Sequence, residues 1–167
     1  SNIPYNITSY FLKKFLSQEP KPKMMVLLIQ KEVAVRICAK AGKMSLLSNS
    51  VQLYGIPKVI SVVSKENFYP VPEVDSAIIK IEDIKTWGQA KRKDLNLSEK
   101  DFWRILKAGF SAKRKKLLNN LAGGLQLDRD IVKTVFSEAE IDEQIRAQNL
   151  EISDWFNVAK NLENHLN

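Results

Sequence analysis

Residues 23–30, which read Lys-Met-Met-Val-Leu-Leu-Ile-Gln, decide the fold class of this chain. Their apolar part, Met24 to Ile29, is a continuous run of strand length, which is typical of a strand covered on both faces in a parallel sheet. Upstream, residues 7–16 carry apolar side chains near helical spacing and predict a helix that ends before Pro20. A helix followed by a buried strand favours an α/β fold.

The segments that follow alternate between helical and strand patterns. Residues 31–40 and 45–54 predict two short helices, each followed closely by a glycine. Residues 58–64 and 77–82 are rich in β-branched side chains and predict two further strands. The Pro-rich loop between these strands is too long for a tight hairpin turn.

The character of the chain changes beyond residue 84. Residues 85–97 are charged and weakly apolar, which predicts a linker between domains. Residues 98–167 carry almost no strand signal and repeat apolar side chains at helical spacing, with one helix expected to close at Gly123-Gly124. We therefore expect an α/β part over residues 1–84 and a small all-α domain over residues 98–167.

Composition excludes several classes of site. Cys38 is the only cysteine and His165 the only histidine, so we expect neither an internal disulfide nor a metal site. The longest apolar run is far shorter than the roughly 20 residues that a membrane span needs. No signal peptide pattern precedes this run, so we expect no membrane partner and a reducing, cytoplasmic setting.

Positive charge is concentrated in one block. Residues 84–116 hold eleven basic and three acidic side chains, whereas residues 117–167 hold four basic and nine acidic ones. Such a block suggests a face that binds a polyanion. Its densest run, Lys113, Arg114, Lys115 and Lys116, is predicted to contact phosphates without reading bases, although a solvated helix face is the structural alternative.

Two stretches carry residue types suited to chemistry on a nucleobase. The first, Asn2-Ile3-Pro4-Tyr5, offers an amide, a backbone carbonyl and an aromatic ring, although it also fits a strand that ends in a proline turn. The second is the loop at 67–77, whose prolines would hold Phe68 or Tyr69 in place as a stacking platform. The alternative is a Phe that simply plugs the sheet.

Both stretches resemble motifs of one family. Residues 2–9, Asn-Ile-Pro-Tyr-Asn-Ile-Thr-Ser, resemble the Asn-Leu-Pro-Tyr-Asn-Ile-Ser/Thr motif of the small-subunit ribosomal RNA adenine dimethyltransferases. Residues 68–77 resemble the Phe-x-Pro-x-Pro-x-Val-Asp-Ser-Ala signature of the same family. Shorter matches at residues 30–32 and 109–115 extend the resemblance to nearly the whole chain.

The resemblance implies a fold, a reaction and a set of roles. It implies that residues 1–84 form the back part of a Rossmann-like class I methyltransferase domain. It also implies transfer of methyl groups from S-adenosylmethionine to N6 of adenines in small-subunit ribosomal RNA, within a pre-ribosomal particle. The predicted catalytic residues are Asn2, Pro4, Tyr5 and Phe68, and the predicted cofactor contacts are Asn2, Ile3 and Pro4.

Those residue types suit the implied reaction. The Asn2 side-chain oxygen and the Pro4 carbonyl can accept hydrogen bonds from the adenine amine and hold it in line with a methyl donor. Tyr5 and Phe68 can sandwich an adenine that has left its stack. The run from Lys113 to Lys116 would then bind the RNA backbone.

The sequence departs from the family at the cofactor site. Enzymes of this type bind the cofactor with a Gly-rich turn, yet the six glycines include no Gly-x-Gly. We therefore expect these 167 residues to be inactive alone, with an unpaired apolar edge at residues 24–29 that promotes association. A non-catalytic ribosome-binding module, a transcription-factor relative and an enzyme acting on large-subunit RNA are the alternatives.

Overall fold

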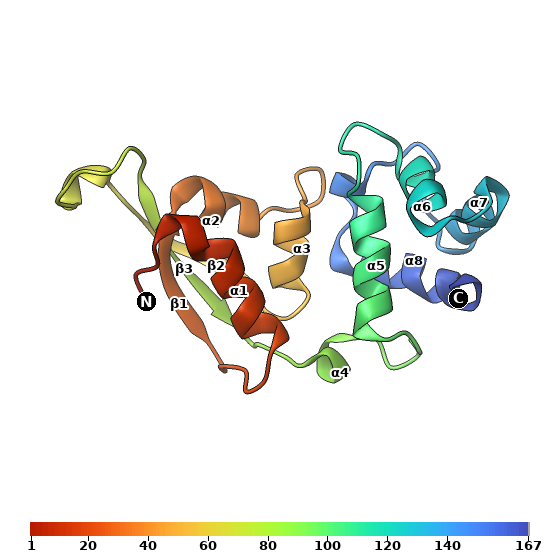
Figure 1. Cartoon of the computed structure of the whole chain (residues 1–167), viewed down its shortest axis with the longest axis horizontal. Helices are drawn as coiled ribbons and strands as arrows, with labels where there is room; N and C mark the ends of the chain where they lie inside the picture. Colours follow the sequence, from red (N-terminus) through yellow and green to blue (C-terminus); the bar gives the residue numbers. More distant parts are fainter. Residues whose placement is uncertain (167) are drawn as a thin grey trace. The chain divides into compact units, whose positions relative to one another are not determined.

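The computed structural model describes residues 1–166, which divide into two compact units. The first unit contains residues 1–39 and 47–90. The second contains residues 40–46 together with the described chain from Lys91 onward. Strands and helices alternate in the first unit, whereas the second is helical (Figure 1).

The first unit begins with a short helical turn and contains the only sheet of the described chain. Its elements are η1 (Tyr5–Ile7), α1 (Thr8–Ser17), β1 (Met25–Gln30), α2 (Lys31–Ile37), α3 (Leu46–Gln52), β2 (Ile56–Val63), η2 (Lys65–Asn67), β3 (Ser76–Glu82) and α4 (Trp87–Ala90). Helix α2 is shorter than predicted, and Gly42 lies beyond its end in a turn with a φ of 93°.

The sheet has the strand order β1-β3-β2, and β3 pairs antiparallel with both neighbours. The predicted strand is present at residues 25–30, but the prediction that it is covered on both faces and paired only in parallel is wrong within the described chain. Met25, Leu27 and Ile29 are buried, whereas Val26 between them is 44% exposed. A continuous apolar run cannot reveal this, because apolar residues on the uncovered face hide the alternation of the strand.

The other edge of β1 carries the N-terminal residues. Asn2 forms an isolated parallel bridge with Leu28. The Leu28 N–H donates to the Ser1 carbonyl at 3.0 Å, and the Ile3 N–H donates to the Leu28 carbonyl at 3.4 Å. The apolar edge predicted to be unpaired is thus partly paired within the described chain, while association through it stays a prediction.

Helices cover one face of the sheet. Ile79 and Ile81 of β3 are fully buried on that face, as is Ile37 of α2. Leu12 and Leu16 of α1 are each 1% exposed, and α2 contacts all three strands. The loop between β2 and β3, coloured yellow, extends away from the sheet (Figure 1). The sheet therefore supplies a rigid base from which this loop projects.

The described residues of the second unit form four helices and two short turns. Its elements are α5 (Glu99–Gly109), α6 (Leu117–Leu125), α7 (Arg129–Glu138), η3 (Ala147–Asn149), α8 (Ile152–Leu162) and η4 (Glu163–His165). Ser98 caps α5, because its hydroxyl accepts a hydrogen bond from the Asp101 N–H at 3.1 Å. Trp155, Phe102 and Phe136 are fully buried and form the centre of the unit.

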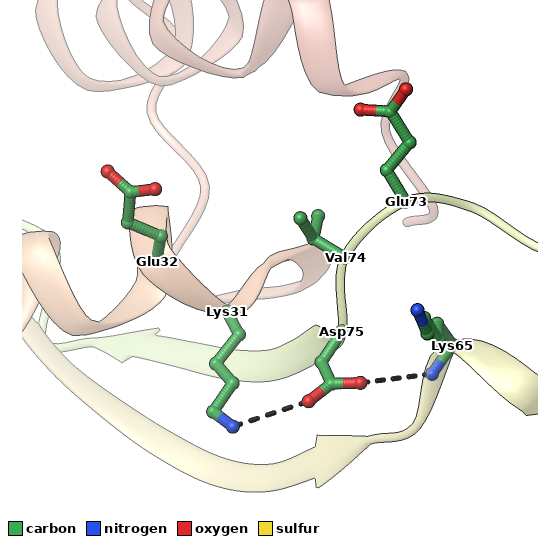
Figure 2. Close-up of a pocket in the computed structure, with 6 residues that line it drawn as sticks. All are labelled: Lys31, Glu32, Lys65, Glu73, Val74 and Asp75. Carbon is green, nitrogen blue, oxygen red and sulfur yellow. Dashed lines mark hydrogen bonds and ion pairs between the residues drawn. The ribbon is translucent and has the colours of Figure 1, made fainter.

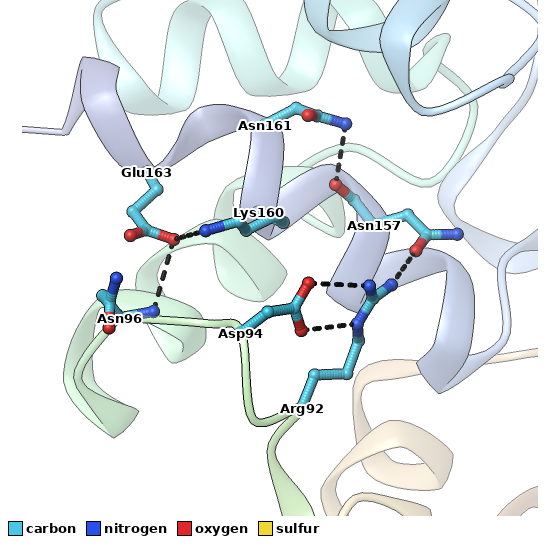
Figure 3. A network of polar contacts seen from close by, with 7 residues as sticks. All are labelled: Arg92, Asp94, Asn96, Asn157, Lys160, Asn161 and Glu163. Carbon is cyan, nitrogen blue, oxygen red and sulfur yellow. Dashed lines mark hydrogen bonds and ion pairs between the residues drawn. The ribbon is translucent and has the colours of Figure 1, made fainter.

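Polar contacts tie the start of this unit to its last helix (Figure 3). The Arg92 guanidinium forms an ion pair with Asp94 and donates to the Asn157 side chain of α8. The Asn96 N–H donates to the Glu163 carboxylate at 3.3 Å. Residues 91–97, which fall within the predicted linker, therefore pack as part of the second unit, whereas α4 belongs to the first.

The two glycines of α6 do not close the helix. The prediction of an end at Gly123-Gly124 is wrong, since α6 continues to Leu125 and stops at Gln126, whose φ of 58° is left-handed. A Cβ on Gly124 would lie 2.7 Å from the Cβ of Ala108, whereas one on Gly123 would meet nothing within 4 Å. Gly124 is needed for close approach of α5 and α6, not for a turn.

We predict that Gly124→Ala destabilises the chain by about 1–3 kcal/mol, because the added methyl group overpacks the contact with Ala108. Gly123→Ala is the matched control and should be neutral or stabilising by up to about 1 kcal/mol, since alanine favours a helix interior. Urea unfolding followed by circular dichroism measures both. Equal unfolding midpoints for the two variants would contradict this account of the glycine pair.

Candidate functional site

A cavity of about 310 Å³ in the first unit brings together the two stretches that resemble the family motifs, at residues 2–5 and 68–72. Its lining consists of Asn2, Ile3, Pro4, Tyr5, Phe68, Tyr69, Pro70 and Pro72. All residues predicted to have catalytic or cofactor-binding roles are among them, although they come from opposite ends of the first unit's sequence. The geometry places these residues at one site, and their roles remain a proposal.

Tyr5 is fixed by a hydrogen bond to the sheet. Its hydroxyl lies 2.7 Å from the hydroxyl of Ser76, which is fully buried at the start of β3. Ser76 pairs with Gln30 of β1 and Val63 of β2, so it lies where all three strands meet. Sequence reasoning gave Ser76 no role. Its hydroxyl directly before a predicted strand was the signal that could have identified it, because a buried polar group requires a hydrogen-bond partner.

Asn2 contributes a side-chain amide to the cavity lining, whereas Pro4 contributes a backbone carbonyl. Both residues are exposed, and within the described chain the Asn2 side chain makes no hydrogen bond. The Pro4 carbonyl accepts a hydrogen bond from the Ile7 N–H at 3.1 Å. A carbonyl oxygen has two lone pairs, so Pro4 keeps one for a ligand. The cavity therefore offers two neutral acceptors close together in sequence.

Phe68 is held by the closure of its own loop. Its N–H donates to the Lys65 carbonyl at 3.2 Å, which ends η2. The Asp75 carboxylate accepts hydrogen bonds from the Lys65 N–H at 3.2 Å and the Lys31 ammonium group at 3.3 Å (Figure 2). The Lys31 N–H also donates to the Asp75 carbonyl at 3.0 Å. Asp75 thus closes the loop by its contact with Lys65 and ties it to Lys31, the first residue of α2.

Two hydrogen bonds lower the pKa of Asp75 below its usual range. The one from the Lys65 backbone N–H has the larger effect, and the one from the Lys31 side chain has the next largest. Asp75 therefore remains ionised at neutral pH, as its two donors require. Beside it lies a second cavity, of about 380 Å³, lined by Lys31, Glu32, Lys65, Glu73, Val74 and Asp75 (Figure 2). Its mixed charges favour neither an anion nor a cation. Sequence reasoning missed the role of Asp75.

The basic run lies in the second unit. Lys113, Arg114, Lys115 and Lys116 are all exposed, and they form the loop between α5 and α6 instead of a helix face. The buried Asn120 holds this loop, because its side-chain amide donates to the carbonyls of Gly109 at 2.7 Å and Ala112 at 3.0 Å. The loop therefore presents its four cations from a fixed base.

Helix α5 extends the positive surface of the second unit. Lys100, Arg104 and Lys107 are exposed at positions i, i+4 and i+7, which lie on one helix face. Sequence reasoning assigned no role to these three residues. Their spacing was the signal that could have identified them as one stripe.

Among residues 1–166, no group of three or more His, Cys, Asp or Glu side chains could hold a metal ion. No helix over the same residues is long and apolar enough to cross a membrane.

Residues 1–164 match the sequence model of the family described as ribosomal RNA adenine dimethylase. The chain belongs to this family. It is 44% identical over 155 residues to ribosomal RNA small subunit methyltransferase A of Dehalococcoides mccartyi strain CBDB1, covering 93% of this chain and 52% of that protein. It is 37% identical over 161 residues to the protein of the same name from Fusobacterium nucleatum, covering 96% and 59%. This dimethylase-family chain thus spans about half the length of the curated relatives it matches.

Solved structures confirm the fold class. A dimethyladenosine transferase from Plasmodium falciparum is similar with a TM-score of 0.79 and 26% identity, over 98% of this chain and 65% of that one. The 23S rRNA methyltransferase ErmE is similar with a TM-score of 0.68 and 20% identity, over 97% and 63%, and indicates the fold alone. The expected back part of a Rossmann-like methyltransferase followed by helices is therefore the observed architecture of this family member.

We predict that Tyr5→Phe and Ser76→Ala each destabilise the chain by about 1 kcal/mol, because each removes the same hydrogen bond. The double variant should be destabilised by less than the sum of the two, and urea unfolding of all four proteins measures this coupling. Thr8→Ser is a control that changes a nearby buried residue but retains its hydroxyl. Strictly additive losses would show that the Tyr5 and Ser76 hydroxyls do not stabilise the fold through one another.

Proposed function

We propose that this chain is the adenine-holding part of an enzyme that transfers methyl groups from S-adenosylmethionine to N6 of adenines in small-subunit ribosomal RNA. The observation that supports this most is the single cavity lined by Asn2, Pro4, Tyr5 and Phe68. Membership of the ribosomal RNA adenine dimethylase family supports it as well. The small-subunit assignment follows the names of the bacterial relatives.

The cavity residues suit an extruded adenine. The amine of adenine is a poor nucleophile because its lone pair is delocalised into the ring. Acceptors at the Asn2 side chain and the Pro4 carbonyl would orient this amine and stabilise the positive charge that develops on it. Tyr5, held by Ser76, and Phe68, held by its closed loop, would replace the base stacking that the adenine loses.

The cofactor would be held only in part by these residues. S-adenosylmethionine would supply the methyl group, and Asn2, Ile3 and Pro4 are the residues predicted to contact it. The cavity lining contains no carboxylate that could bind a ribose, and the chain contains no Gly-x-Gly turn. We therefore expect residues beyond these 167 to supply the other cofactor contacts.

The central test is methyl transfer by the intact protein that contains this chain. We expect it to form dimethyladenosine in small-subunit RNA or a pre-ribosomal particle, and Asn2→Ala to lower kcat by about 100-fold or more. The Asn2 side chain is exposed and makes no hydrogen bond in the described chain, so the melting temperature should not change. The product can be quantified by mass spectrometry of RNA digests.

Two controls make this result specific. Asn6→Ala changes an exposed asparagine four residues away that does not line the cavity, and it should leave kcat unchanged. Residues 1–167 alone should neither transfer methyl groups nor bind S-adenosylmethionine with micromolar affinity in calorimetry. An intact protein that binds the RNA tightly but never methylates it would favour the non-catalytic ribosome-binding module instead.

The RNA backbone would be contacted by the basic loop of the second unit. Charge reversal of Lys113, Arg114, Lys115 and Lys116 to glutamate should weaken binding to small-subunit RNA and lower the slope of log affinity against log salt. Lys13→Glu and Lys14→Glu, two exposed lysines of α1, provide a control of the same charge type. An unchanged salt slope in the loop variant would remove this loop from the RNA-binding surface.

A further inference from the structure

Tyr69 is the most exposed large side chain that is apolar or aromatic in the described chain. It is 100% exposed, whereas the next most exposed tyrosine, Tyr10 on α1, is 67% exposed. Tyr69 nevertheless lines the cavity that holds Phe68 and Tyr5. No hydrogen bond or ring contact joins its side chain to another described residue. The fold therefore makes no use of this ring, although it lies at the candidate site.

The backbone around Tyr69 is constrained even though the side chain is not. Pro70 and Pro72 fix their own φ angles and both line the cavity. The loop is closed at its base by the hydrogen bond from the Lys65 N–H to Asp75. It extends away from the sheet in Figure 1. A ligand that contacts Tyr69 would thus meet a ring whose backbone is already ordered, which lowers the entropic cost of binding.

Tyr69 and Phe68 are not placed to stack on the same base. Phe68 has extended backbone angles, φ −121° and ψ 149°, so its side chain and that of Tyr69 leave the backbone in different directions, although both residues line the cavity. Phe68 is half-buried on the cavity side, whereas Tyr69 is fully exposed at its rim. An adenine held between Phe68 and Tyr5 would leave the Tyr69 ring for a neighbouring group of the same strand.

We propose that Tyr69 stacks on the nucleobase adjacent to the target adenine, so that the rim of the cavity binds a second, unpaired base. This inference rests on the proposed function for the adenine itself. The ligand of Tyr69 and the adenine site together would be single-stranded RNA of at least two nucleotides. Any base can take the second position, because every base has an aromatic face to stack. The tyrosine hydroxyl is not required.

The test uses the full chain and short single-stranded RNAs with one central adenine. Fluorescence anisotropy should show that Tyr69→Ala weakens binding by about tenfold, the effect of losing one stacked base. Tyr69→Phe should stay within about twofold of the wild type, because it keeps the aromatic face. Tyr10→Ala, which removes the other highly exposed tyrosine, should change nothing.

Abasic RNAs identify the base that Tyr69 contacts. Removing the base on one side of the adenine should weaken wild-type binding to the level of Tyr69→Ala. With that RNA, Tyr69→Ala should have no further effect. The proposal is overturned if Tyr69→Ala binds the intact RNA as tightly as the wild type. It is also overturned if the loss persists undiminished when either neighbouring base is removed.

Phe68→Ala separates this proposal from the proposed function. If Phe68→Ala weakens binding and Tyr69→Ala does not, the adenine site stands and the second stacking position is refuted. If only Tyr69→Ala weakens binding, with the abasic pattern above, the rim position stands and the adenine site is refuted. A wild-type chain that binds none of these RNAs overturns both.

Discussion

The candidate site depends on two adjacent residues, Ser76, which begins the central strand, and Asp75, which directly precedes it. The Ser76 hydroxyl holds Tyr5 at 2.7 Å, and the Asp75 carboxylate holds the base of the loop that carries Phe68. Ser76 pairs with residues of both β1 and β2, so it cannot move without disturbing the sheet, and Asp75 is joined to it directly in the chain. Two aromatic walls that are far apart in sequence are therefore positioned from one point of the fold.

In the second unit, a few contacts between α5 and α6 likewise hold the basic loop, residues 113–116, in place. Gly124 lets α6 approach Ala108 of α5, and the buried Asn120 on α6 satisfies the carbonyls of Gly109 and Ala112. A buried amide that bonds to two backbone carbonyls is stable only when both partners stay in place. The loop between the two helices is consequently fixed at its base, while its four cations remain exposed.

Sequence patterns predicted the types of element and the motifs that line one cavity, and they failed where the outcome depends on tertiary partners. The strands, the helical tail and the cavity-lining motifs follow from periodicity, proline and the resemblance, and the structure brings the motifs together. The antiparallel pairing of β1 could not be predicted, because its direction is set by β3 about 50 residues later. Gly124 was wrongly predicted to end a helix, because the local sequence does not show that Ala108 packs against it. Ser76 was overlooked because its partner, Tyr5, lies at the other end of the unit.

This arrangement also explains why the loop can carry an exposed aromatic residue without loss of order. If the gap between Tyr5 and Phe68 depended on packing along the loop, a change at the tip would alter the gap. Instead the loop is closed at Lys65 and Asp75, and Tyr5 is held independently by Ser76. Tyr69 contributes nothing to either attachment and is fully exposed. A change of the side chain at position 69 would therefore leave both attachments of the candidate site in place.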